Sequence, residues 1–181
     1  MQKRLSVAIA SVLVLSFGGA AIAAEKADAT AYAEEIISMR SSLAKTFVLP
    51  GAEVNEDTFK KVCGAVGKKV KEINEKGDVK IRHAATKYRN PVNAATPEEA
   101  AVIERFAKEP DLKEVSGTFE KDGKKFSRYT RPIYVESACL ACHGEKDARP
   151  AFIKAKYPDD RAYGFKTGDL RGIISVVTPT E

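Results

Sequence analysis

Five consecutive residues in the last third of this 181-residue chain, Cys139-Leu140-Ala141-Cys142-His143, form a CxxCH motif. Two thiols three positions apart lie on the same side of one helical turn. From there they can bond to the two vinyl groups of a single porphyrin, and the adjacent histidine can become the proximal ligand of its iron. The motif therefore predicts one covalent c-type haem, with Cys139 and Cys142 as thioether residues and His143 as proximal ligand.

A zinc site or a redox dithiol is the alternative interpretation of a CxxC pair. Zinc would need further Cys or His ligands at paired spacing. Outside the motif the chain has only one cysteine, Cys63, and one histidine, His83. A redox dithiol would not need His143 and is typical of thioredoxin-like βαβ surroundings. Haem attachment is therefore the better interpretation of the motif.

The first 23 residues have the three parts of a secretory signal peptide. These parts are the basic pair Lys3 and Arg4, the apolar run 7–17 and the cleavage site Ala21-Ile22-Ala23. The apolar run is too short to span a membrane comfortably, and no second hydrophobic segment follows. Because c-type haem is attached outside the bacterial inner membrane, export agrees with the haem motif. We expect a signal peptide over residues 1–23 and a periplasmic domain over 24–181, without a membrane span.

Cleavage would leave 158 residues, a length typical of one domain. The full chain has a formal net charge of +5, which falls to +3 with the loss of Lys3 and Arg4. This mild excess is spread along the sequence, so it gives no argument for nucleic acid binding, although it could help an acidic redox partner to dock. Haem attachment would use two of the three cysteines and leave Cys63 without an intramolecular disulfide partner.

Hydrophobic periodicity and turn signals predict helices first and strands later. We expect helices at residues 27–47, 57–75, 97–108 and 150–156. We expect strands at residues 79–85, 113–121, 124–134 and 171–178, with the second and third joined by the turn Asp122-Gly123. The first helix should bury a stripe made of Tyr32, Ile36, Ile37, Leu43, Ala44 and Phe47. Helices followed by a small antiparallel sheet predict an α+β fold of PAS-like type.

Cys63 lies on the apolar face of the second expected helix, together with Val62, Val66 and Val70. It could be a small buried hydrophobic residue, which is a common role for free cysteine. With a haem in the same core, its thiolate could instead be the distal ligand, which would lower the reduction potential of the iron. The other candidates for that position are His83, Met39 and an open iron site.

The chain resembles the bacterial periplasmic haem domains that have a PAS-like fold and one c-type haem. Such domains occur as stand-alone secreted proteins and as sensing modules of membrane histidine kinases. The segments that carry the resemblance are Phe59–Cys63, Arg89–Asn93, Cys139–Gly144 and Gly168–Val176. The resemblance implies a six-coordinate haem whose axial ligands are the motif histidine and a distant cysteine, here His143 and Cys63.

Haem propionates need cationic or hydroxyl partners at the rim of their pocket. Several such side chains lie within plausible reach of the motif, namely Arg89, Arg128, Tyr129, Arg131 and Tyr134. No one of them stands out from the sequence. The pair Asp159-Asp160 could suggest paired carboxylates, but the preceding Pro158 makes a turn the better explanation.

Electron transfer or redox sensing through a His/Cys-ligated haem is the expected function, with a redox partner protein or a membrane sensor as the partner. The alternative is a five-coordinate haem that binds NO or CO. A haem enzyme acting on peroxide or nitrogen oxides would need an open iron site and a distal acid–base residue. His83 is the single histidine outside the motif, so the sequence favours a cytochrome over an enzyme.

Overall fold

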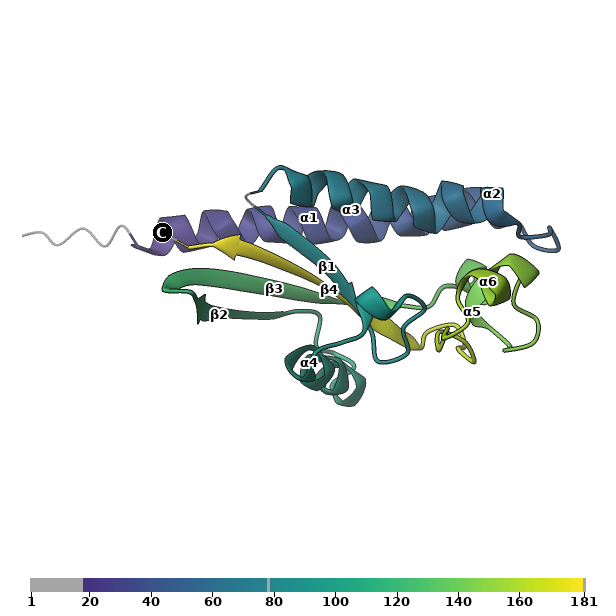
Figure 1. Ribbon diagram of the computed structural model, residues 1–181. Helices are drawn as coiled ribbons and strands as arrows, with labels where there is room; N and C mark the ends of the chain where they lie inside the picture. The colour runs from purple at the N-terminus through teal and green to yellow at the C-terminus, as the bar shows by residue number, and fades with distance from the viewer. Residues whose placement is uncertain (1–17, 78, 181) are drawn as a thin grey trace, which may run out of the picture.

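The structure, a computed structural model, describes residues 18–77 and 79–180. These residues form a four-stranded antiparallel sheet with helices on both faces (Figure 1). The expected signal peptide falls mainly on residues 1–17, which lie outside the described residues, whereas residues 18–23 begin the first helix. Across the described part of the chain, no helix combines the length and the apolar character needed to cross a membrane.

The expected helices are confirmed, with two differences, of which the first is that the helix expected at 27–47 begins at Gly18. The helical elements are α1 (Gly18–Phe47), α2 (Glu56–Phe59), a π-helical turn (Lys60–Gly64), α3 (Ala65–Glu75), α4 (Pro97–Lys108), α5 (Leu140–His143) and α6 (Ala151–Lys156). The helix expected at 57–75 is thus interrupted by the π-helical turn between α2 and α3. Such turns are rare, and they occur frequently at functional sites. Cys63 lies within this one.

The strands are β1 (Lys80–Ala84), β2 (Val115–Lys121), β3 (Lys124–Tyr134) and β4 (Leu170–Pro179). They pair antiparallel in the order β1-β4-β3-β2. Asp122 and Gly123 both have positive φ, 53° and 70°, as the predicted two-residue hairpin turn requires. The α+β prediction is therefore confirmed, while the likeness to PAS domains stays a prediction.

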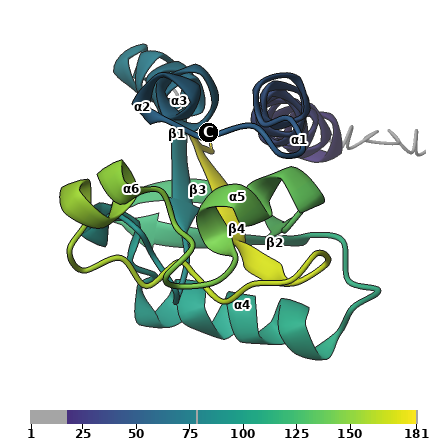
Figure 2. The same cartoon turned by 90° about the vertical axis from the view of Figure 1, so that its right-hand side faces the viewer.

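Two helices, α1 and α3, lie side by side on one face of the sheet, and α4 covers the other (Figures 1 and 2). Successive residues of β4 alternate between these two layers. Ile174 and Val176 are buried in the cluster that α1 and α3 form with the sheet, whereas Ile173 is buried against α4. β4 is therefore the central strand of the core.

The apolar stripe of α1 is confirmed except at its last residue. Ile36 and Ala44 are buried, but Phe47 is 39% exposed. Phe47 is the final residue of α1, and its ring lies beneath the ammonium group of Lys61, 5.5 Å from the ring centroid. The prediction that Phe47 is buried is therefore wrong, because the covered face of α1 ends before it.

Gly172 permits a close contact between β4 and β1. Its φ is +154°, and a Cβ atom at this position would lie 2.5 Å from the carbonyl oxygen of Ala84. We expect Gly172→Ala to lower the free energy of unfolding by about 2–4 kcal/mol, because both the backbone strain and the overlap must be relieved. Urea denaturation followed by circular dichroism measures the change. Gly117→Ala in β2 is the control, since no heavy atom lies within 4 Å of its added Cβ. Equal losses in both variants would contradict the packing argument.

Candidate haem-binding site

The CxxCH motif follows the end of β3 and is helical, as expected. Cys139 ends a 3-10 turn (Ser137–Cys139), and the next four residues form α5. The amide of Gly144 donates to the carbonyl of Leu140 at 2.8 Å and ends this helix, where a Cβ atom would lie only 2.7 Å from the same oxygen. Cys139 and Cys142 are both free, half-buried thiols. One short helical segment therefore carries both sulfurs and the histidine.

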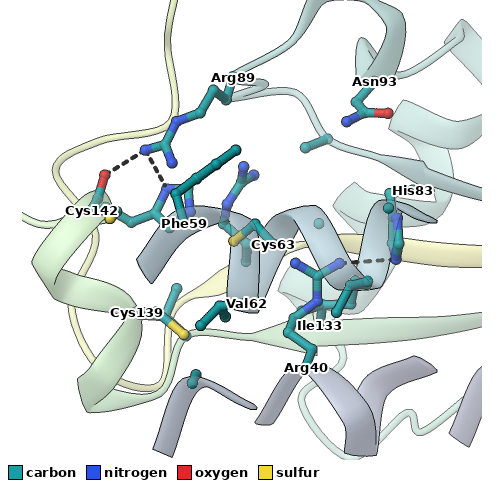
Figure 3. Close-up of a pocket in the computed structure, with 18 of the residues that line it drawn as sticks. Arg40, Phe59, Val62, Cys63, His83, Arg89, Asn93, Ile133, Cys139 and Cys142 are labelled. Atoms are coloured by element: carbon teal, nitrogen blue, oxygen red, sulfur yellow. Dashed lines mark hydrogen bonds between the residues drawn. The ribbon is translucent and has the colours of Figure 1, made fainter. Parts of the chain in front are cut away.

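A cavity of about 380 Å³ lies between this segment, the helix that contains Cys63 and the end of the sheet (Figure 3). Its lining includes Cys63, Cys139, Cys142 and His143. Much of the remaining surface is apolar, with contributions from Phe59, Val62, Val66, Ile133, Val135 and Ile173. The volume falls in the range of small-molecule and cofactor pockets. The fold thus brings the motif and a cysteine about 80 residues away to one apolar cavity.

His143 is held in one tautomer and one orientation. Its Nδ1–H donates to the carbonyl oxygen of Ala162 at 2.7 Å, and its ring meets the Phe165 ring edge-on, 6.2 Å between centroids. Burial, with the nearby guanidinium groups of Arg171 and Arg89, holds the pKa of His143 well below its ordinary value. The imidazole is therefore neutral, and its Nε2 lone pair remains available to a metal.

Asp160 anchors the loop that supplies this carbonyl oxygen. Its carboxylate is fully buried and accepts from Arg89 at 3.2 Å, from Arg149 at 2.6 Å and from the amide of Ala162 at 2.8 Å. Arg89 also donates to the carbonyl of Cys142 at 2.5 Å (Figure 3). The turn interpretation of Asp160 is therefore incomplete, because this carboxylate joins the motif to the loop that orients its histidine.

The two motif thiols have the wrong acidity for a redox dithiol. Burial raises the pKa of Cys142 to about 11 and also raises the pKa of Cys139. Redox-active CxxC pairs instead contain a thiol of low pKa that is a thiolate near neutral pH. Within residues 18–77 and 79–180, no group of three His, Cys, Asp or Glu side chains could hold a metal ion. The structure therefore supports neither the dithiol nor the zinc interpretation.

Cys63 reaches the cavity from the π-helical turn, on a different wall from the motif (Figure 3). It is a half-buried free thiol beside the buried Val62. Its sulfur forms no disulfide with either of the other two described cysteines. The structure thus places Cys63 where the sequence expected it, with its sulfur free to bind a group inside the cavity.

The two rival distal ligands differ in position. His83, on β1, lines the cavity, but its Nε2 is 3.0 Å from a guanidinium nitrogen of Arg40 and accepts its hydrogen bond. Burial and the charges of Arg40 and Arg171 hold the pKa of His83 well below its ordinary value. Met39 packs against the core cluster of α1, α3 and the sheet and is not part of the cavity lining. Cys63 is therefore better placed than His83 or Met39 as a candidate ligand for a group in the cavity.

Only part of the expected propionate set reaches the cavity. Arg89 and Tyr134 line it, but the other three residues do not. Arg128 lies over the Phe119 ring, Arg131 pairs with Glu34, and the hydroxyl of Tyr129 donates to Glu114 at 2.8 Å. All three lie outside the cavity lining. Tyr129 and Arg131 are on the same face of β3 as Ile133, but they precede the end of the strand that reaches the cavity.

Two arginines that the sequence reasoning missed, Arg40 and Arg171, line the cavity in their place. The sequence pattern could have identified Arg40 as a residue that faces the core. It lies one helical turn from both Ile36 and Ala44, on the buried stripe of α1. Arg171 is the second residue of β4, next to Gly172, and nothing in the sequence pattern marked it as a cavity residue. The cavity therefore has three cationic side chains among otherwise mainly apolar residues.

Comparisons with known proteins show the family of this chain. The Tll0287-like family matches residues 19–179, a range that contains Cys63 and the whole CxxCH motif. The crystal structure of the cyanobacterial haem protein Tll0287 is similar to this chain, with 40% sequence identity and a TM-score of 0.76. The likeness covers 87% of this chain and 96% of that one. Among curated proteins, none matches at a significant level. This chain therefore belongs to the Tll0287-like family.

Proposed function

We propose that this protein is a periplasmic monohaem c-type cytochrome of PAS-like fold that acts in electron transfer or redox sensing. Cys139 and Cys142 would hold the haem covalently, and His143 and Cys63 would be its axial ligands. The observation that carries the proposal is the apolar cavity shared by the CxxCH motif and Cys63, in a chain 40% identical to a haem protein.

The residues present fit a covalently bound haem. His143 is neutral with Nε2 free, both motif cysteines are reduced thiols, and the surrounding surface is largely apolar. Each thiol would add across one vinyl C=C bond: a C–S bond forms at one vinyl carbon, and the thiol hydrogen is transferred to the other. No oxidant or leaving group is needed. When bound, the haem would supply a one-electron Fe(III)/Fe(II) couple.

The protein residues would set the properties of this couple. Ala162 and Asp160 would keep His143 oriented, as outer partners do for histidine ligands in general. Cys63, as a thiolate, would donate electron density and lower the reduction potential. Apolar residues such as Phe59 and Ile133 would exclude water. A carrier and a sensor would share this site and differ in their partner, a redox protein in the first case and a membrane sensor in the second.

Covalent attachment is tested on protein co-expressed with a c-type haem maturation system. We expect one haem per chain, retained after acid–acetone extraction. Cys139→Ala or Cys142→Ala should each leave one vinyl group free and shift the pyridine haemochrome band away from the c-type position. The double variant should release its haem on extraction, because no thioether remains.

Cys63→Ala is the matched control for these variants, since it removes a cavity cysteine outside the motif. Its haem should stay covalently attached, with the haemochrome band of the wild type. Haem that is extracted completely from the wild-type protein would contradict the proposed attachment.

A further inference from the structure

The cavity has an excess of positive charge. Its lining includes Arg40, Arg89 and Arg171 and, among the described residues, no aspartate or glutamate. The positive charge of Arg89 is balanced by its buried ion pair with Asp160. The other two guanidinium groups have no ion pair with a carboxylate in the described part of the chain, so their charge is not balanced within the cavity.

Arg40 extends from the buried stripe of α1 into the cavity. One of its terminal nitrogens donates to Nε2 of His83 at 3.0 Å, and its Nε is buried without a hydrogen-bond partner. A buried N–H of a charged group is normally satisfied, because leaving it without a partner is costly. The Nε atoms of Arg128 and Arg131 are buried without a partner too, but those residues lie outside the cavity. At Arg40 the orphaned donor coincides with a cavity that can hold a further acceptor.

Arg171 is similarly poor in partners. One terminal nitrogen donates to the carbonyl of Lys87 at 2.9 Å, and the guanidinium lies over the Phe165 ring, 5.4 Å from its centroid. Burial, together with the charges of Arg40 and Arg89, lowers the pKa of Arg171 to about 10. Cations brought together away from water are stable only when an anion compensates them.

The two arginines match the charge of the group proposed for the cavity. A haem has two propionates, on the pyrrole rings opposite the pair that bears the vinyl groups. In Figure 3, Cys139 and Cys142 lie on one side of the cavity, whereas Arg40 and His83 lie on the other. We propose that Arg40 and Arg171 bind the two propionate carboxylates of the haem, and that His83 positions Arg40. This inference rests on the proposed function and adds to it the residues that hold the acidic edge of the cofactor.

The test compares Arg40→Gln and Arg171→Gln with Arg161→Gln in the haem-loaded protein. Arg161 is the matched control, because its guanidinium lies over the Tyr88 ring near the same end of the molecule and is not part of the cavity lining. The first readout is the propionate bending region of the resonance Raman spectrum, which responds to hydrogen bonds at these carboxylates. The second is the reduction potential, because a cation beside the haem stabilises the more negative, reduced form.

We expect the propionate bands to move in both cavity variants and to stay unchanged in Arg161→Gln. The equilibrium constant for reduction should fall several-fold in each cavity variant; a tenfold fall corresponds to about 59 mV. Arg40→Lys keeps the charge and should retain most of the potential while still moving the bands, because an ammonium group lacks the planar fork of guanidinium. It also replaces Arg40→Gln as the test if that variant does not fold.

Unchanged propionate bands in the cavity variants, with haem c attached, would overturn this assignment and leave the proposed function intact. Equal shifts in the cavity variants and the Arg161→Gln control would also overturn it, since the effect would then be general electrostatics. A wild-type protein that carries no haem would overturn both proposals.

Discussion

Replacement of Cys63 with serine is expected to abolish the low-spin thiolate signal in the electron paramagnetic resonance spectrum of the ferric protein. The iron should become high-spin, because a neutral hydroxyl is a weak ligand. The reduction potential should rise by more than about 60 mV, a tenfold change in the redox equilibrium, since the thiolate stabilises the ferric iron. Low-temperature spectra and a potentiometric titration of wild type and variant measure both effects.

Two further variants separate Cys63 from its rivals. Cys63→His should restore a low-spin spectrum of the bis-imidazole type, because the π-helical turn presents this position to the cavity. His83→Gln should keep the thiolate signal. Loss of the signal in His83→Gln but not in Cys63→Ser would show that His83 is the distal ligand. A high-spin spectrum of the wild type that does not change in Cys63→Ser would mean an open iron site. It would then favour the function of binding NO or CO.

Replacement of Asp160 with asparagine is expected to cost about 3–5 kcal/mol of the free energy of unfolding, the usual penalty for breaking a buried ion pair from one side. The carboxylate is fully buried between Arg89 and Arg149, and both guanidinium groups are nearly buried themselves. Asparagine would leave these two positive charges without an anion. Chemical denaturation of the wild type and the variant measures the loss.

The neighbouring residue supplies a matched control. Asp159 is exposed, so Asp159→Asn removes the same charge one position away and should change stability by less than about 0.5 kcal/mol. In a double-variant cycle, Asp160→Asn and Arg149→Met should be strongly non-additive, because they remove the same interaction. A loss below about 1 kcal/mol for Asp160→Asn would contradict the role of this carboxylate as the anchor of the loop.

Local patterns in the sequence were sufficient for nearly all helices and strands. The period of apolar residues predicted α1 and α3, and the helix-start residues from Pro97 predicted α4. The Asp122-Gly123 turn predicted the β2–β3 hairpin, because each of these signals lies within one short segment. The CxxCH spacing likewise specified one helical turn. The π-helical turn was missed, since its apolar positions fit a regular helix over so short a span.

The composition of the site depended on contacts between distant segments, which one sequence does not reveal. Arg40 on α1 and Arg171 on β4 meet at one cavity only because β4 lies in the middle of the sheet. Asp160 has the sequence context of a turn residue, and its burial follows from its partners, Arg89 and Arg149. Arg128, Tyr129 and Arg131 were considered because they shortly precede the motif in the chain, but only the end of β3, at Ile133 and Tyr134, reaches the cavity.

The central position of β4 has a consequence for the order of assembly. A chain is synthesised from its N-terminus, so the CxxCH motif emerges before residues 170–179, the strand that lies between β1 and β3. Until β4 arrives, β1 and β3 have no strand between them and the sheet cannot close. Enzymes that attach a prosthetic group could therefore reach both thiols in an open chain. If the haem is attached as proposed, the strand order would allow attachment before the last strand enters the sheet.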